Sequence, residues 1–331
     1  MKRRHFIAAL GGTLALGPRL ARAQASSKLA RVGLLIPSAL GAPATIENFS
    51  AVRRAFAELG YIEGQNIVFE QRGGDGSAGR LAANAAELVA SKVDVIIAIA
   101  TPAARAAQQA TKTIPIVVGS VGDPVQDGFV ESLSHPGGNI TGTTFLGPEL
   151  VPKRFALLRE MLPIASRIAV LWNPNAFGEK TTAGMLAQTA DAAKALGMEL
   201  RYFDVVGLDQ LERAFSEAAD WHADSIFQFP NPTFFENRKR LVDLAAKHRL
   251  PAMYNAREFV EVGGLLGYGA SPVVQNARTA VYVDKIIKGA RPADLPVEQP
   301  TIFDFAINRT TAKTLGIEIP ITLLAAAEVI D

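Results

Sequence analysis

Residues 93–119 read VDVIIAIATPAARAAQQATKTIPIVVG and decide the fold class. The apolar run at 93–100 has the length of a strand that is buried on both faces. A helix is predicted at 102–111, with Pro102 in its first turn. A second apolar run follows at 114–119. A strand, a helix and another strand in this order indicate a parallel sheet with a right-handed crossover.

The same alternation extends in both directions from this segment. Toward the N-terminus it predicts strands at 31–37 and 66–71 and helices at 46–60 and 81–91. Toward the C-terminus it predicts a short helix at 128–133 and a strand at 139–145. A second series then begins, with helices at 150–162, 180–196, 208–219 and 234–248 and strands at 167–172, 199–203, 224–229, 252–254 and 264–266. The sequence therefore predicts an α/β protein with two Rossmann-like lobes, each built on a parallel sheet.

The C-terminal part contains too few elements for a third domain. It predicts a helix at 273–288, an extended proline-rich stretch at 292–300, a strand at 302–307 and the start of a helix at 310–315. The economical interpretation is that the chain returns to the first lobe and then crosses again to the second. This assigns residues 24–146 and 270–300 to the first lobe and residues 147–269 and 301–331 to the second. Crossings near 145–150, 269–273 and 300–303 would form a multi-strand hinge.

The N-terminal segment has the pattern of an export signal. Residues 2–7 (KRRHFI) place paired arginines before an apolar stretch at 6–16, and residues 21–23 (ARA) form a small-x-small cleavage site. Eleven residues are too few for a bilayer span, which needs about 20. We expect cleavage after Ala23 and a periplasmic protein. The twin arginines favour the twin-arginine route, with the general secretory route as the alternative.

Composition excludes several kinds of chemistry. The chain has 331 residues, which suggests about two domains. It contains no cysteine, which excludes disulfides, thiolate metal sites and cysteine nucleophiles. Residues 1–23 hold five of the 34 basic residues and no acid, so 29 basic residues face 32 acidic ones after cleavage. A mildly acidic protein gives no reason to expect nucleic acid as a partner.

Enzyme motifs are weak or missing. Residues 74–79 (GDGSAG) spell G-x-G-x-x-G, and Asp94 follows Gly74 by twenty positions. A dinucleotide site needs its acid at the carboxyl end of a strand, whereas Asp94 falls at the amino end of the 93–100 strand. The three histidines after the signal lie far apart, so no metal, cofactor or catalytic residue is predicted. An exported Rossmann-like oxidoreductase remains the alternative to a binding protein.

Ligands of open parallel sheets bind beyond the carboxyl ends of the strands. In the first lobe this rule selects Ser38, Thr101 and Asp123. Thr101 precedes a helix, so it would hold an anionic group such as a carboxylate, or it would only cap that helix. Asp123 would pair with a ligand ammonium, or it would only form a turn before Pro124.

In the second lobe the same rule selects Asn173, Asn231, Tyr254 and Tyr268. The two amides offer a donor and an acceptor toward a cleft, although each also begins an ordinary Asn-Pro turn. The two tyrosines would stack on an aromatic or apolar ligand, or would pack at the edge of the lobe.

Segments spread over nearly the whole chain resemble one family. They are ELGYIEGQNI (58–67), TIPIV (113–117), GDPV (122–125), HPGGNITG (135–142), VLWNP (170–174), AKHRLPA (246–252) and LPVEQPT (295–301). Together they resemble the substrate-binding proteins of ABC transporters of the tryptophan/tyrosine type. The resemblance implies a type I periplasmic-binding-protein fold and a small molecule, an amino acid or related organic solute, held between the lobes. It further implies delivery of the ligand to an inner-membrane ABC permease, and we expect the protein to be a monomer. A ligand-sensing partner of a membrane receptor is the remaining alternative.

Overall fold

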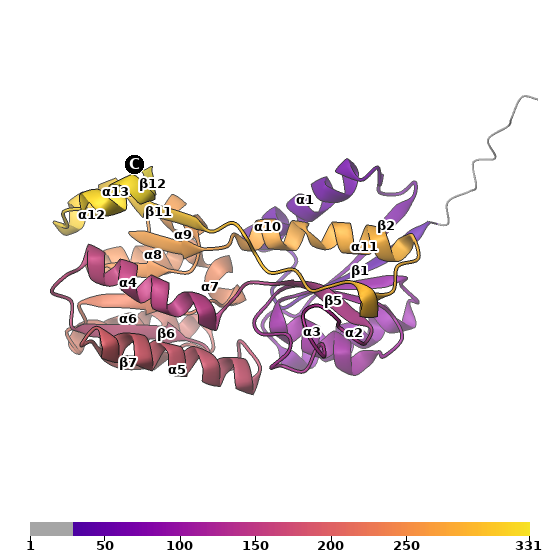
Figure 1. The fold of residues 1–331 in the computed structure, drawn as a ribbon, viewed down its shortest axis with the longest axis horizontal. Coiled ribbons are helices and arrows are strands. Elements are labelled where there is room, and N and C mark those ends of the chain that lie inside the picture. The colour runs from indigo at the N-terminus through magenta and orange to yellow at the C-terminus, as the bar shows by residue number, and fades with distance from the viewer. Residues whose placement is uncertain (1–28) are drawn as a thin grey trace, which may run out of the picture.

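The computed structural model describes residues 29–331. The predicted export signal at 1–23 lies outside these residues. Within 29–331, no helix is both long and apolar enough to cross a bilayer. The described chain forms two lobes that lie side by side along the long axis of the molecule (Figure 1). We call them lobe 1, which contains strands β1–β5, and lobe 2, which contains strands β6–β12.

Lobe 1 is built on a five-stranded sheet in the order β2-β1-β3-β4-β5. All neighbouring strands in it are parallel, as the sequence predicts. The strands are β1 (Ala30–Ile36), β2 (Ile67–Gly73), β3 (Val95–Ile99), β4 (Ile116–Val121) and β5 (Ile140–Thr144). The helices of this lobe are α1 (Pro43–Glu58), α2 (Ala78–Ala90), α3 (Ala100–Ala110), α10 (Pro272–Ala277) and α11 (Thr279–Ile287), with the 3-10 turn η3 (Pro292–Asp294).

Lobe 2 is built on a seven-stranded sheet in the order β12-β11-β10-β9-β8-β6-β7. The strands are β6 (Arg167–Trp172), β7 (Glu199–Asp204), β8 (Ser225–Gln228), β9 (Ala252–Tyr254), β10 (Leu266–Gly269), β11 (Asp304–Asn308) and β12 (Glu328–Ile330). The helices are α4 (Val151–Met161), α5 (Glu179–Ala195), α6 (Leu211–Asp220), α7 (Pro232–Glu236), α8 (Arg238–Lys247), α9 (Arg257–Glu261), α12 (Arg309–Leu315) and α13 (Ile321–Ala326), with 3-10 turns η1 (Pro148–Leu150) and η2 (Leu208–Gln210).

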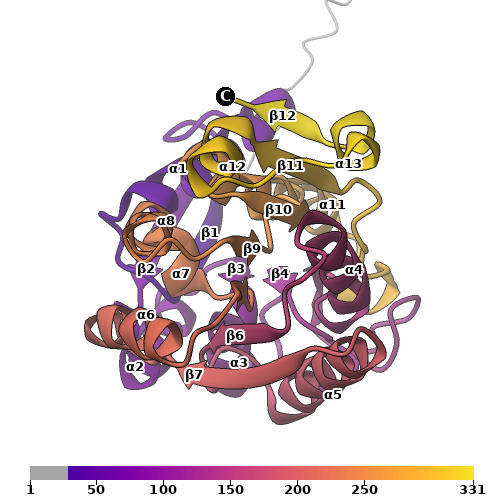
Figure 2. The same ribbon diagram turned by 90° about the vertical axis from the view of Figure 1, so that its left-hand side faces the viewer.

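Alternate strand residues pack on opposite faces of each sheet, because successive side chains of a strand point to opposite sides. In β3, Val95 and Ile97 pack with α1 and α11, whereas Ile96 and Ala98 pack with α2 and α3. Helices α4 and α5 cover one face of the lobe 2 sheet, and α6, α7 and α8 cover the other (Figure 2). Each lobe thus has its own core on both sides of a buried sheet.

Three segments of chain connect the lobes (Figure 1). The first leaves β5 after Thr144 and reaches η1 at Pro148. The second joins the end of β10 to α10, which packs against α1 of lobe 1. The third follows Glu298, which pairs with Thr143 beside β5, and enters β11. Because β11 enters lobe 2 from the side at which β10 leaves it, these two strands are antiparallel, an exception to the predicted parallel sheet.

Several predicted elements differ from the structure. The helix predicted at 128–133 is wrong: Phe129 and Val130 both donate to the carbonyl of Pro124, and the segment is a loop. The helix predicted at 234–248 is two helices separated at Asn237, whose side chain donates to the carbonyl of Thr233. The short elements α9, α13 and β12 were not predicted, because a few residues carry too little periodicity.

Candidate functional site

The carboxyl ends of the two sheets face each other across a cavity. In lobe 1 the strand order reverses between β1 and β3, and the residues that follow them, Ser38 and Ala100, border the cavity. In lobe 2 the order reverses between β6 and β8, and Phe177 and Asn231 lie in the loops after these strands and border the cavity. Such reversal points are where open α/β sheets bind ligands.

The cavity has a volume of about 110 Å³. On the same measure one water molecule needs about 10–15 Å³, so the space is large enough for a small organic molecule. Most of the lining is apolar, and its aromatic members are Phe49, Phe145, Phe177 and Phe235. A mostly apolar cavity with a few polar groups is typical of small-molecule sites.

Two residues at the lobe 1 wall have strained backbones. Ala100 has a φ of 65° where β3 passes into α3, and Ser120 has a φ of 52° near the end of β4. Left-handed conformations cost non-glycine residues roughly 1–2 kcal/mol. Such strain is concentrated at functional sites, where the surrounding structure holds it in place.

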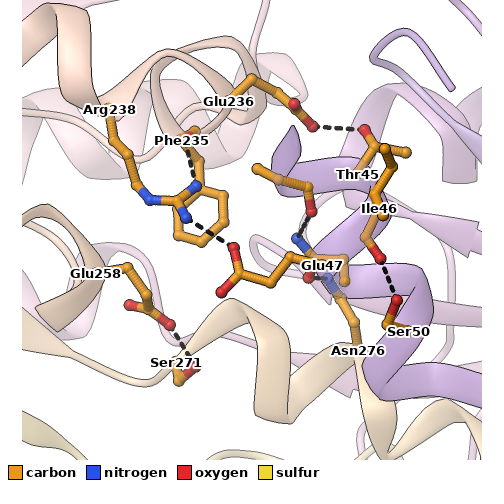
Figure 3. A network of polar contacts seen from close by, with 12 residues as sticks. Thr45, Ile46, Glu47, Ser50, Phe235, Glu236, Arg238, Glu258, Ser271 and Asn276 are labelled. Atoms are coloured by element: carbon orange, nitrogen blue, oxygen red, sulfur yellow. Dashed lines mark hydrogen bonds and ion pairs between the residues drawn. The ribbon is translucent and has the colours of Figure 1, made fainter. Parts of the chain in front are cut away.

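Polar contacts join the lobes at one side of the cavity (Figure 3). Thr45 of α1 donates a hydrogen bond of 2.7 Å from Oγ1 to Oε1 of Glu236 at the end of α7. Arg238 of α8 forms an ion pair of 2.7 Å with Glu47 of α1. These contacts fasten the N-terminal turns of α1 to lobe 2.

Other contacts join the lobes near the N-terminus of α5. The backbone N–H of Asp123 donates to Oγ1 of Thr181 over 3.2 Å. The buried carboxylate of Asp127 lies against Gly178, where an added Cβ would be only 2.1 Å from Oδ1. Burial raises the pKa of Asp127, whose two carboxylate oxygens have no hydrogen-bond partner. The described structure is therefore closed, with contacts between the lobes on both sides of the cavity.

Lobe 2 supplies two ionisable side chains to the lining, Arg154 from α4 and Glu236 from α7. Burial lowers the pKa of Arg154 to about 10, so the guanidinium stays protonated at neutral pH. Burial raises the pKa of Glu236, and this shift is opposed by the hydrogen bond from Thr45 and by the charge of Arg238. Oε2 of Glu236 is buried without a hydrogen-bond partner.

Two of the seven predicted ligand residues border this cavity. They are Ser38 after β1 and Asn231 after β8. Oδ1 of Asn231 accepts hydrogen bonds from the N–H groups of Thr233 and Phe234 and so caps α7. The side-chain NH₂ of Asn231 is therefore the group left for a ligand, since its oxygen is used in the cap.

Three other predicted residues use their side chains in local structure outside the lining. Oγ1 of Thr101 accepts from the N–H of Gly122, and Thr101 lies inside α3 rather than at its N-cap. Oδ1 of Asp123 accepts from the N–H groups of Val125 and Gln126, which closes a turn. Oδ1 of Asn173 likewise accepts from Asn175. Their predicted ligand roles stay predictions, and the geometry gives each side chain a structural role.

The two predicted tyrosines also lie outside the lining. Tyr254 is fully buried and stacks on Phe259, with ring centroids 4.9 Å apart. Burial raises the pKa of Tyr254. Tyr268 packs beside Phe303 and Phe305, and its carbonyl accepts a hydrogen bond of 2.7 Å from Nε of Arg154. Both side chains therefore pack within lobe 2, and their stacking on a ligand stays a prediction.

Several lining residues were not singled out by the sequence. Arg154, Glu236, Asn48 and Asn276 all lie on helices, and Asn276 belongs to α10, which follows the second crossing between the lobes. Ser120 and Asn276 form a chain with Asn48: Oγ of Ser120 donates to Oδ1 of Asn276, and Nδ2 of Asn276 donates to Oδ1 of Asn48. One usable signal was Ser120 itself, which follows the predicted strand at 114–119 and so meets the strand-end rule.

The glycine-rich segment at 74–79 and Asp94, which were considered as a dinucleotide site, have structural roles. Ser77 in the glycine-rich segment caps α2 by accepting from the N–H of Arg80. Asp94 precedes β3 and accepts from the N–H of Arg31, which confirms its predicted place at the amino end of the strand. Among residues 29–331, no group of three or more histidine, aspartate and glutamate side chains is arranged to hold a metal ion.

Comparisons with known proteins identify the relatives of this chain. A curated tyrosine-binding protein of Clostridioides difficile is 27% identical over 267 residues, which cover 80% of this chain and 75% of that protein. A conserved domain protein of Vibrio cholerae is 30% identical, with a TM-score of 0.84, over 92% of this chain and 100% of that one. An ABC domain in complex with L-Trp from Streptococcus pneumonia is 26% identical, with a TM-score of 0.82 and the same coverage.

These comparisons confirm the predicted fold and family. The fold is that of type I periplasmic binding proteins, two Rossmann-like lobes joined by three crossing segments. Residues 35–330 match the family described as ABC transporter substrate binding protein. Since this match spans most of the chain, the protein belongs to the ABC transporter substrate binding protein family.

Proposed function

We propose that this protein is the solute receptor of an ABC importer and binds an amino acid or a related organic solute between its lobes. The observation that carries the proposal is the cavity at the facing carboxyl ends of the two sheets, lined from both lobes. A ligand in this position contacts both lobes at once. It therefore stabilises the closed arrangement over any arrangement in which the lobes are apart.

The class of ligand is supported by the relatives and by the lining. One relative is named a tyrosine-binding protein, and another was crystallised with L-Trp. The aromatic side chains of Phe49, Phe177 and Phe235 border the cavity and suit an apolar or aromatic ligand side chain. Ser38 and Asn231 are proposed to contact the polar end of the ligand.

Contacts between the lobes stand beside the cavity, so ligand entry is proposed to accompany their separation. We propose that they rotate about the three crossing segments at 145–147, 270–271 and 299–303. An inner-membrane ABC permease would then distinguish the closed form from the open form by surfaces of both lobes. The proposed setting is the periplasm after removal of the export signal, and the proposed receptor is a monomer that performs no chemistry on its ligand.

Purified mature protein tests this proposal. A thermal-shift panel of the twenty amino acids, small organic acids, amines and sugars, followed by calorimetry, should give a ligand that raises the melting temperature. NMR of the recovered ligand should show no conversion. The alternative of an exported oxidoreductase predicts binding of NAD or NADP and turnover. Stabilisation by a nicotinamide dinucleotide, or no ligand in the whole panel, would reject the receptor function.

A further inference from the structure

The side chain of Arg154 is a buried cation with no counter-charge. It is 2% exposed and extends from α4 to the cavity lining. Nε donates to the carbonyl of Tyr268 over 2.7 Å, and Nη2 lies 3.5 Å from the carbonyl of Asn255. Nη1 is buried without a partner, and no carboxylate of residues 29–331 forms an ion pair with this guanidinium.

This arrangement is costly for a structural arginine. A buried charge is normally paired, because removing an ion from water costs several kcal/mol that only a counter-ion and hydrogen bonds recover. The two carbonyls fix the plane of the guanidinium but bring no negative charge. The positive charge of the guanidinium therefore has no counter-charge, and it lies at a wall of the ligand cavity.

A second arginine on the same helix shows what a structural role looks like. Arg159 donates from Nη1 to the carbonyl of Pro163 and from Nη2 to the carbonyl of Leu196, at 2.7 and 2.6 Å. It is partly exposed and lies away from the cavity, so water solvates its charge. Arg154 has the same kind of carbonyl contacts, but it is buried from solvent and forms no ion pair with an acid among residues 29–331.

We propose that Arg154 is the anchor for a carboxylate of the ligand, which supplies the missing counter-charge through Nη1. The inference rests on the proposed receptor function and adds to it a specific requirement: a ligand that carries a carboxylate. A guanidinium held by fixed carbonyls is already oriented, so little side-chain freedom is lost when the anion binds.

The ammonium group of an amino acid has a candidate partner in the same cavity. Glu236 borders the cavity from α7, and its Oε2 has no hydrogen-bond partner. Its neighbour Arg238 donates to Glu47 instead (Figure 3). A ligand with both a carboxylate and an ammonium group would satisfy Arg154 and Glu236 together.

The experiment compares amino acids with amines that lack only the carboxylate. Calorimetry would measure L-tyrosine against tyramine and L-tryptophan against tryptamine, on the unmodified mature protein, R154Q, R154K and R159Q. In the unmodified protein we expect the amino acid to bind at least tenfold more tightly than its amine. R154Q should weaken binding of the amino acid at least tenfold and change the affinity for the amine by no more than twofold. R154K should bind the amino acid with intermediate affinity. R159Q should have the affinities of the unmodified protein.

Two outcomes would contradict the proposal that Arg154 anchors a ligand carboxylate. If R154Q lowers the affinity for the amino acid and the amine equally, or lowers neither affinity, Arg154 has only a structural role. If the unmodified protein binds an amine as tightly as its amino acid, or binds only uncharged solutes, no carboxylate anchor exists although the receptor function stands. If R154Q does not fold, the ligand pairs on the unmodified protein and R154K decide. Absence of any ligand in the full panel rejects the proposed function itself.

Discussion

The two lobes share an architecture but give the cavity different chemistry. Both are built on sheets of mainly parallel strands whose carboxyl ends face the cavity. The lining from lobe 1 contains no ionisable side chain and includes the strained backbones of Ala100 and Ser120. The lining from lobe 2 contains both ionisable groups, Arg154 and Glu236. Lobe 1 is thus a rigid wall that sets shape, and lobe 2 supplies the charge that selects a ligand.

The strongest test of the rigid wall is Gly119→Ala in β4. An added Cβ would lie 2.7 Å from Cδ1 of Ile99 and 2.8 Å from Oδ1 of Asn276, beside the cavity. Overpacking of this kind costs about 1–3 kcal/mol, so urea unfolding should show a loss of that size. The control is Gly184→Ala in α5 of lobe 2, whose added Cβ meets nothing closer than 3.6 Å. Equal stability of the two variants would contradict a rigid lobe 1 wall.

The charge of lobe 2 is tested by Glu236→Gln. Burial raises the pKa of this carboxyl in the closed form, so closure of the unmodified protein is favoured as pH falls through that pKa and disfavoured as pH rises through it. Without ligand at pH 7, the variant should therefore shift the equilibrium between open and closed lobes toward the closed form.

Small-angle scattering between pH 4 and 8 measures this difference as a smaller radius of gyration. The unmodified protein should approach the variant at the acidic end, where Glu236 is protonated. Curves that coincide at every pH would show that the Glu236 charge has no influence on closure.

A smaller effect is expected from the ion pair that joins the lobes. Glu47→Gln removes the partner of Arg238, which should weaken closure by about 0.2–1 kcal/mol and less at high salt, because the pair is partly exposed. Ligand affinity by calorimetry should fall by the same amount. Glu328→Gln breaks the pair with Arg257 inside lobe 2 and serves as the control, with affinity unchanged. An equal loss in both variants would argue against a contact specific to closure.

The smallest effect is expected at the strained position itself. Ala100→Gly removes a left-handed penalty of roughly 1–2 kcal/mol but adds roughly 0.5–1 kcal/mol of chain entropy, for a net gain near 0.5 kcal/mol. Lys92→Gly, at a φ of 56° and remote from the cavity lining, should gain about as much stability. Only Ala100→Gly should also change ligand affinity, because only residue 100 belongs to the lobe 1 wall of the cavity. A stability loss at residue 100 would mean that its backbone is not strained.

Sequence patterns predicted the fold well because the central strands β1, β3, β4 and β6 are largely apolar runs buried on both faces. The same logic selected Ser38 and Asn231, which come shortly after β1 and β8 and border the cavity. It placed Thr101, Asp123 and Asn173 at strand ends as well, but their oxygens accept local backbone hydrogen bonds. A strand-end rule selects a neighbourhood and cannot separate a capping oxygen from a ligand-binding one.

The charged lining groups were beyond sequence reasoning for a different reason. Arg154 and Glu236 lie on helices, and helical periodicity distinguishes only a buried face from an exposed one. Whether a buried arginine meets an acid, a carbonyl or a cavity depends on residues more than 100 positions away, such as Tyr268 and Asn255. For Tyr254, the strand is too short for its alternation to show that the ring packs on Phe259.

The three crossing segments have a consequence for the order in which the protein matures. Helices α10 and α11 cover one face of the lobe 1 sheet with α1, yet they are translated only after most of lobe 2. A nascent chain that stops at residue 146 therefore lacks two of the helices that cover that sheet face, and neither lobe is formed by one contiguous segment of its own. Translation must pass residue 298, whose backbone pairs beside β5, before the first half of the protein can complete its core.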